Sequence, residues 1–272
     1  MSVLTNKIEY RALLIGQTYP GTSSQLYGPA NDARGMSSML KNMTGTKYTV
    51  TTMSNLTGSG ILSAVGSVFG EADCNDVTLF FYSGHGLYSS NEAALGSLCG
   101  VNGTTVSPDQ LRTKMDQYQG KKVVIIDSCH SGNMIGKSDG DASAQAFNNA
   151  FLAAFGRGAK ANLAASGYYV LTAASKSQSS YETKVNGKWY GVFTRALTYG
   201  GGWNELSSSR LSKLYADSNG DKRITLNELY NYTRSRVTQL GYGSAKAMIL
   251  VIVIAVISLL QVALTSKKEV SQ

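Results

Sequence analysis

Residues 77–86 read VTLFFYSGHG, a continuous apolar run that ends abruptly in small polar residues and a histidine. An uninterrupted run of this kind is typical of a strand in the middle of a parallel sheet, because both faces of such a strand are buried. A second run, Val123 to Ile126, is followed by DSCHSG at 127–132. Both strands therefore end in polar residues at the edge where open parallel sheets bind their ligands.

Strand and helix patterns alternate around these two runs. We expect further strands at 11–16, 48–54 and 168–172, helices at 28–43, 57–69 and 107–119, a hairpin around 94–106 and a last core helix beginning at 192. This alternation predicts an α/β domain with a mostly parallel central sheet that is covered by helices on both faces. The Gly-, Ser- and Ala-rich stretch 133–167 interrupts the pattern, so we expect a flexible connection there around a short helix at 147–155.

The composition narrows the class of protein. A chain of 272 residues with 43% apolar residues and 3 prolines suits one substantial globular domain, which we place at residues 1–242. The net charge is +8, but the basic residues are scattered, so we expect no nucleic-acid partner. The three cysteines lack metal-ligand or disulfide spacing, which favours a reducing, cytoplasmic environment.

The two ends of the chain differ. The first ten residues contain no apolar stretch of the length that a secretory signal needs. Residues 247–265 are almost entirely apolar and are flanked by lysines, which predicts a C-terminal transmembrane anchor. A buried terminal helix or strand is the alternative. The charges on either side slightly favour a cytoplasmic catalytic domain that is tethered to a membrane.

The histidines and one cysteine suggest catalysis. His85 and His130 are the two histidines of the chain, and each follows a buried strand; Cys129 lies 44 positions after His85. A nucleophilic thiol needs a base or proton donor within reach, and adjacent strand ends can bring His85 beside Cys129. The alternative is that Cys129 is an inert thiol in the hydrophobic core. The neighbouring Asp127 and His130 argue against it, because such polar residues are unfavourable in a core. We assign no chemistry to Cys74 and Cys99.

The motifs YSGHG at 82–86 and DSCHSG at 127–132 resemble the two catalytic motifs of metacaspases and bacterial caspase-like cysteine peptidases. The resemblance extends from YRALLIG at 10–16 through GPANDA at 28–33 to GVFT at 191–194. It implies the caspase-hemoglobinase fold and an endopeptidase that needs no cofactor for its chemistry. It also implies that Cys129 attacks the substrate carbonyl, that His85 protonates the leaving amine, and that the amides of Gly86 and Cys129 hold the oxyanion.

The resemblance also implies a preference for protein or peptide substrates with Arg or Lys before the scissile bond. Metacaspases of this specificity resemble the chain at Asp32, Ser83 and Asp127. Two carboxylates and a hydroxyl that converge on one pocket would bind a guanidinium or an ammonium group. In the alternative reading, Asp32 caps a helix turn and Asp127 orients a loop.

Peptidases of this group often mature by self-cleavage after the catalytic cysteine. Lys137, Arg157 and Lys160 in the flexible stretch are the candidate cleavage sites. A second class of function is also consistent with the sequence: a catalytically silent, caspase-like scaffold or calcium sensor. The presence of both Cys129 and His85 favours the enzyme.

A separate signal is DSNGDKRITLNE at 217–228, which resembles an EF-hand calcium loop. Its predicted ligands are Asp217, Asn219, Asp221, Arg223 through its backbone carbonyl, Thr225 and Glu228. Lys222 occupies the position at which glycine normally makes the sharp turn, and it adds a positive charge. The loop therefore predicts a regulatory or structural Ca²⁺ site, or else a polar turn that caps a helix at 226–236.

Overall fold

The computed structural model describes residues 7–87, 89, 91, 93–130, 140–156, 167–173 and 182–237, without the side chains of 129, 130 and 140–145. By its internal contacts the chain divides into residues 1–233 and a second unit, 234–272.

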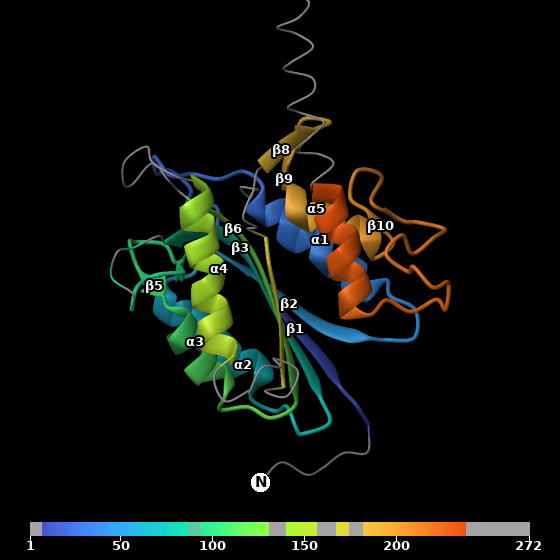
Figure 1. Ribbon diagram of the computed structural model, residues 1–272, viewed down its shortest axis with the longest axis horizontal. Coiled ribbons are helices and arrows are strands. Elements are labelled where there is room, and N and C mark those ends of the chain that lie inside the picture. Colours follow the sequence, from blue (N-terminus) through green and yellow to red (C-terminus); the bar gives the residue numbers. More distant parts are fainter. Residues whose placement is uncertain are drawn as a thin grey trace, which may run out of the picture. The chain divides into compact units, whose positions relative to one another are not determined.

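Five parallel strands form the centre of the sheet, in the order β2-β1-β3-β6-β7 (Figure 1). They are β1 (Tyr10–Gly16), β2 (Tyr48–Ser54), β3 (Val77–Leu87), β6 (Lys121–His130) and β7 (Tyr168–Thr172). The predicted hairpin is confirmed as β4 (Ser97–Cys99) and β5 (Thr105–Val106), and β4 pairs antiparallel with the end of β3. Phe80, Phe81 and Tyr82 in β3 are fully buried, as the apolar run predicts.

Helices cover both faces of this sheet. Figure 1 shows α1 (Pro29–Lys41) and α5 (Val192–Gly200) on one face, with α2 (Gly58–Phe69), α3 (Pro108–Met115) and α4 (Gly140–Gly156) on the other. The predicted helix starts are confirmed: Thr57 Oγ1 accepts the Gly60 N–H at 3.1 Å, and Ser107 forms a capping box with Gln110. The expected mostly parallel α/β sheet with two covered faces is therefore present.

The structure differs from the sequence prediction at the two motifs. Both histidines were expected to follow the ends of their strands, yet β3 continues through His85 to Leu87 and β6 continues to His130. The two extensions pair with each other, which gives their backbone groups hydrogen-bond partners and keeps them extended. The helix expected at 147–155 is also longer and begins at Gly140.

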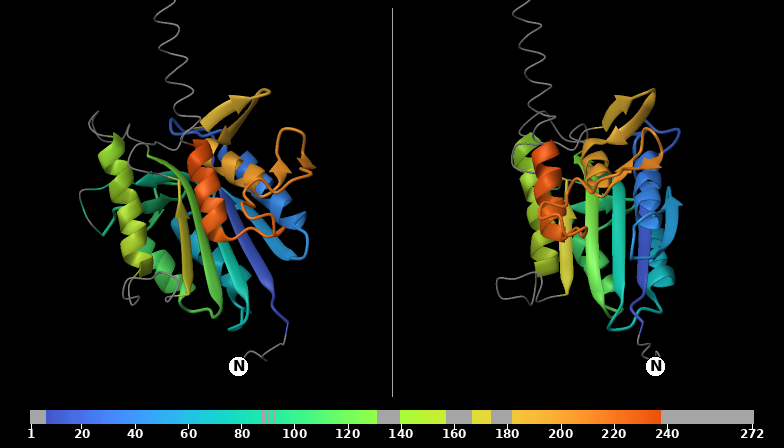
Figure 2. Two further views of the ribbon diagram at one scale, coloured as in Figure 1. Left: turned by 45° about the vertical axis from the view of Figure 1, so that its right-hand side comes forward. Right: turned by 90° about the vertical axis from the view of Figure 1, so that its right-hand side faces the viewer.

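A further hairpin, β8 (Glu182–Val185) and β9 (Lys188–Gly191), was not predicted; a small ladder of β10 (Trp203–Asn204) and β11 (Ser209–Arg210) follows α5. Figure 2 shows β8 and β9 at the carboxyl ends of the central strands. Within the described ranges no helix is both long and apolar enough to cross a bilayer, and the predicted anchor at 247–265 lies outside those ranges.

Candidate active site

The pairing of β3 with β6 aligns the two predicted catalytic residues. The parallel register matches Ser83 with Asp127, His85 with Cys129, and Gly86 with His130. Neighbouring strands lie about 4.8 Å apart, so the backbone of Cys129 runs directly beside that of His85. The side chain of Cys129 lies outside the described atoms. The register therefore supports the predicted pair at the level of the backbone.

The imidazole of His85 has one occupied and one open nitrogen. Its Nε2 lies 2.7 Å from the Ser24 carbonyl oxygen, and because a carbonyl can only accept, we infer that Nε2 carries the hydrogen. The Nδ1 atom is buried and has no hydrogen-bond partner among the described residues. Burial lowers the pKa of His85, while the Ser24 bond and the charge of Glu182 oppose that shift. The ring therefore presents an unprotonated Nδ1 that can accept a proton.

Gly86 is confined by its neighbours. A Cβ atom at this position would lie 2.4 Å from Phe147 Cε2 and 2.4 Å from Ser128 Oγ. Only glycine fits between α4 and β6 without displacing one of them. This close packing places the backbone of Gly86 beside the paired strand ends, where its predicted oxyanion role stays a prediction.

The three predicted specificity residues lie together and are buried. Asp32 Oδ2 accepts the Ser83 hydroxyl at 2.8 Å, and Asp32 Oδ1 accepts the Gly191 N–H at 2.8 Å. A Cβ on Gly191 would lie 2.3 Å from Asp127 Oδ2 and 2.9 Å from Asp32 Oδ2, so both carboxylates converge on this glycine. Burial, followed by the charge of Asp127, raises the pKa of Asp32 well above its usual value.

These contacts also bear on the alternative readings of the two aspartates. The side chain of Asp32 binds Ser83 and Gly191 on other elements, and the residue at the N-cap of α1 is Gly28. Asp127 Oδ2 accepts the N–H and the hydroxyl of Thr194, at 3.1 and 2.6 Å, in the first turn of α5. Asp127 therefore has a structural role at a helix N-terminus in addition to any role in binding.

The hairpin of β8 and β9 is attached to the start of α1, next to this cluster. Glu182 Oε1 accepts the Gly28 N–H at 2.6 Å, and Asn31 Nδ2 donates to the Trp189 carbonyl at 2.8 Å. Because β9 ends at Gly191, these two hydrogen bonds fix the position of Gly191, against which the carboxylates of Asp32 and Asp127 pack.

A third carboxylate near this cluster, that of Glu205, was not predicted from the sequence. Its Oε1 accepts the Thr198 hydroxyl at 2.7 Å, and its Oε2 is buried without a hydrogen-bond partner among the described residues. Burial raises its pKa to about 7, and the charge of Asp127 acts in the same direction. Glu205 belongs to no motif, and only the packing of the turn after α5 against α1 brings it near.

The structure also describes the surroundings of the other two cysteines. Cys74 is exposed and forms no disulfide. Cys99 is half-buried, and burial raises the pKa of its thiol to about 11, which keeps it protonated at neutral pH.

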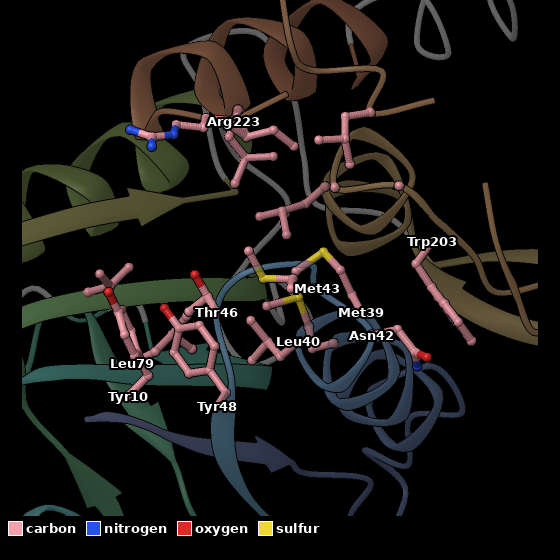
Figure 3. Close-up of a pocket in the computed structure, with 18 of the residues that line it drawn as sticks. Tyr10, Met39, Leu40, Asn42, Met43, Thr46, Tyr48, Leu79, Trp203 and Arg223 are labelled. Carbon is pink, nitrogen blue, oxygen red and sulfur yellow. The ribbon is translucent and has the colours of Figure 1, made fainter. Parts of the chain in front are cut away.

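A cavity of about 690 Å³ lies elsewhere, between the sheet and α1 (Figure 3). Its walls include Tyr10 and Leu79 near the beginnings of their strands, together with Met39 and Met43 (Figure 3). His85 lies six residues farther along β3 than Leu79, or about 20 Å at the rise of a strand. The candidate active site is therefore distinct from this cavity.

The predicted calcium loop has an ordered internal hydrogen-bond pattern. Asp217 accepts the N–H groups of Gly220 and Lys222 at 2.7 and 2.9 Å, and Lys222 has a positive φ of 65°. Glu228 accepts from Thr225 and Ser218, and these bonds lower its pKa to about 2. Among the described residues, however, no three His, Cys, Asp or Glu side chains gather as a metal site would require. The Ca²⁺ site stays a prediction.

Comparison with known proteins agrees with this architecture. The family model of the caspase domain matches residues 9–247. Metacaspase-4 and metacaspase-7 of Arabidopsis thaliana are each 32% identical over 142 residues, which cover 46% of this chain and 34% and 35% of theirs. Metacaspase-1 of Emericella nidulans is 31% identical over 146 residues, 46% of this chain and 36% of its own. The chain thus spans little more than a third of these curated relatives.

The family match covers most of the chain, including both motif strands, and the parallel sheet with helices on both faces is the expected caspase-hemoglobinase arrangement. The resemblance inferred from the two motifs is therefore confirmed, and the chain belongs to the caspase domain family.

Proposed function

We propose that this protein is a cysteine endopeptidase that cleaves peptide bonds after Arg or Lys. The observation that supports the proposal is the register between β3 and β6, which pairs the backbone of Cys129 with that of His85, whose Nδ1 has no hydrogen-bond partner among the described residues. Its membership of the caspase domain family supports the same class of chemistry.

The proposed reaction follows from these groups. His85 Nδ1 accepts the thiol proton of Cys129, and the thiolate attacks the substrate carbonyl carbon. The backbone amides of Gly86 and Cys129 stabilise the oxyanion. The imidazolium then protonates the leaving amine as the C–N bond breaks and leaves a thioester. Water hydrolyses the thioester, with His85 as the base, and the thiol is restored.

The proposed specificity rests on the buried carboxylates. Asp32 and Asp127 repel each other at Gly191, and a guanidinium or ammonium group between them would relieve that repulsion. Ser83, bonded to Asp32, adds a hydroxyl to the same group. Glu205, whose charge also raises the pKa of Asp32, would add a third negative charge. An aspartate side chain of a substrate would be excluded from these surroundings.

A test uses fluorogenic peptides that differ only in the residue before the scissile bond: Arg, Lys, Asp or Gly. We expect cleavage of the Arg and Lys peptides alone, and none by Cys129→Ala or His85→Ala. A chloromethylketone ending in Arg should label Cys129. Equal cleavage by Cys129→Ala would rule out the proposed nucleophile, and cleavage after Asp would rule out the proposed specificity.

The main alternative is a caspase-like scaffold or calcium sensor without turnover. It predicts that the protein binds basic peptides, while neither hydrolysis nor labelling of Cys129 occurs under reducing conditions with Ca²⁺ present. The buried Nδ1 of His85, which has no hydrogen-bond partner among the described residues, favours the enzyme, because such an atom is costly unless it has a function.

We also propose that the enzyme processes itself, at Lys137, Arg157 or Lys160, which lie outside the described residues. Fragments of the wild type and of Cys129→Ala, sequenced after incubation, would identify the cleaved bond, and identical fragments would exclude self-cleavage. A cytoplasmic location with a C-terminal membrane anchor at 247–265 belongs to the same proposal. Fractionation of cells that express the full chain and a chain ending at residue 246 tests the anchor.

A further inference from the structure

The edge of β3 that faces β1 has a gap at the catalytic histidine. The last residue of β3 that pairs with β1 is Ser83, and the first that pairs with β4 is Gly86. Gly86 also pairs with His130 of β6, so β1 and β4 must lie on the same edge, opposite β6. Between them, Gly84 and His85 have no strand neighbour on that edge. Their backbone groups there need other partners.

Two tyrosine hydroxyls occupy this gap. The His85 N–H donates to Tyr19 Oη at 3.0 Å, and Tyr82 Oη donates to the His85 carbonyl at 2.7 Å. The two hydroxyl oxygens lie 3.0 Å apart, and each lies 2.8 Å from the Cys99 carbonyl. Tyr19 and Tyr82 are 6% and 0% exposed, so water cannot replace these bonds.

One assignment of the hydroxyl hydrogens satisfies every backbone group in this cluster. Each hydroxyl has a single hydrogen to donate. If Tyr82 donates to His85 and Tyr19 donates to Cys99, both carbonyls are satisfied and the Tyr19 oxygen is left to accept the His85 N–H. Tyr19 is thus both the acceptor for the histidine and the link from β3 to β4.

Tyr19 also contacts the imidazole itself. The two ring centroids are 4.8 Å apart with planes at 30°, so the tyrosine ring covers one face of the imidazole. The carbonyl that fixes Nε2 belongs to Ser24, in the same loop between β1 and α1. This loop therefore holds the histidine at its backbone, at its ring face and at Nε2, while Nδ1 is left open.

The backbone of Tyr19 is itself held in an uncommon conformation. Its φ of 49° lies in the left-handed region, where residues other than glycine are strained. The Asn55 side chain accepts the N–H groups of Thr18 and Tyr19, at 2.9 and 3.2 Å, which fixes this turn. Strain that is maintained by specific bonds beside a reactive group is typical of a functional position.

We propose that Tyr19 is a positioning residue for His85, acting through its hydroxyl on the histidine backbone and through its ring on the imidazole. The proposal rests on the proposed cysteine peptidase function. Without the hydroxyl, the His85 N–H has no acceptor at the gap, and β3 shifts at the residue that must place Nδ1 beside the nucleophile.

The test is Tyr19→Phe, which keeps the ring and removes the hydroxyl, assayed with an Arg peptide. We expect kcat to fall about 10- to 100-fold, the range for a misplaced catalytic group, while KM stays unchanged. Alkylation of Cys129 by iodoacetamide, followed by mass spectrometry at neutral pH, should slow in parallel, because the misplaced imidazole no longer accepts the thiol proton. Tyr82→Phe, which removes the bond to the His85 carbonyl, should give a smaller loss of kcat.

The control is Tyr48→Phe, a half-buried tyrosine at the start of β2 that packs on Tyr10. It should leave kcat and the alkylation rate at wild-type values. Wild-type kcat and alkylation rate in a folded Tyr19→Phe variant would overturn the inference, as would a lowered melting temperature with no change in kcat. Failure of the proposed function looks different: the wild type itself would show no cleavage that depends on Cys129.

Discussion

The carboxylates of Asp32 and Asp127 meet at a single backbone position, Gly191, although 95 residues separate the two aspartates in the sequence. Asp32 comes from the first turn of α1 and Asp127 from the end of β6, and the glycine ends β9. Two buried negative charges close together are unfavourable unless a cation compensates them. This relationship makes the specificity of the proposed peptidase testable one carboxylate at a time.

We predict that Asp32→Asn weakens cleavage after Arg. Loss of one partner of a buried charge pair costs about 2–4 kcal/mol, so kcat/KM should fall about 30- to 1000-fold. In Asp127→Asn, kcat/KM should fall by a similar factor. The melting temperature should also fall, because the Asp127 carboxylate accepts hydrogen bonds from Thr194 at the start of α5. The control is Asp109→Asn, an exposed residue of α3 on the other face. An unchanged kcat/KM for Asp32→Asn would show that Asp32 does not contribute to substrate binding.

The pKa of Glu205 predicts how stability changes with pH. Burial raises this pKa from its usual 4.5 to about 7, so between these values the folded state holds a proton that the unfolded state has lost. Stability is therefore fully present below about pH 4.5 and falls as the pH rises to about 7, by about 3 kcal/mol. Asp32, whose pKa is also raised, contributes in the same direction.

Urea unfolding at pH 5 and pH 8 measures this dependence, with Cys129→Ala as the background to prevent self-cleavage. Glu205→Gln should reduce the loss of stability between the two pH values, because glutamine stays neutral. Glu71→Gln, an exposed control, should leave it unchanged. A pH dependence that is equal in the wild type and in Glu205→Gln would show that Glu205 ionises freely in the folded protein.

Part of this molecule follows directly from local sequence. The apolar runs 77–82 and 123–126 predicted the central strands because burial on both faces demands apolar residues throughout. The polar residues after these runs predicted where the site lies, and the register between β3 and β6 then aligned the predicted histidine with the predicted cysteine.

Other features depend on tertiary packing and leave no local signal. Glu205 resembles any glutamate in a turn until α1 packs against it at Gly35. Tyr19 becomes a partner of His85 only because β1 ends before the histidine and β4 begins after it. The hairpin at 182–191 has short strands with no alternating pattern, and its attachment to Gly28 and Asn31 gives it a defined place.

Gly86 provides a prediction about packing at the site. In Gly86→Ala, the new methyl group would meet Phe147 and Ser128 at 2.4 Å, and overpacking of this kind costs about 1–3 kcal/mol. We expect a lower urea midpoint and a loss of peptidase activity. Gly156→Ala is the control, since no atom of the described residues lies within 4 Å of its added carbon, and it should be neutral or slightly stabilising. Wild-type stability and activity in Gly86→Ala would show that α4 can move away freely.

The loop at 217–228 leads to a prediction about gain of binding. Lys222 has a φ of 65°, a conformation that costs a residue with a side chain about 1 kcal/mol and that glycine adopts freely. Lys222→Gly should therefore raise the unfolding free energy by about that amount. It also removes a positive charge beside Asp217, whose carboxylate accepts the N–H of residue 222. Both changes should increase affinity for Ca²⁺, measured by calorimetry in the Cys129→Ala background.

Lys222→Ala separates the two effects, because it removes the charge but keeps the strained conformation, so its affinity should lie between those of the wild type and Lys222→Gly. Glu228→Gln, which removes the carboxylate at the last loop position, should abolish the gain. If neither Lys222 variant binds Ca²⁺ at millimolar concentrations, the loop is a polar turn at the start of the helix that begins at residue 226, and its hydrogen bonds serve the fold alone.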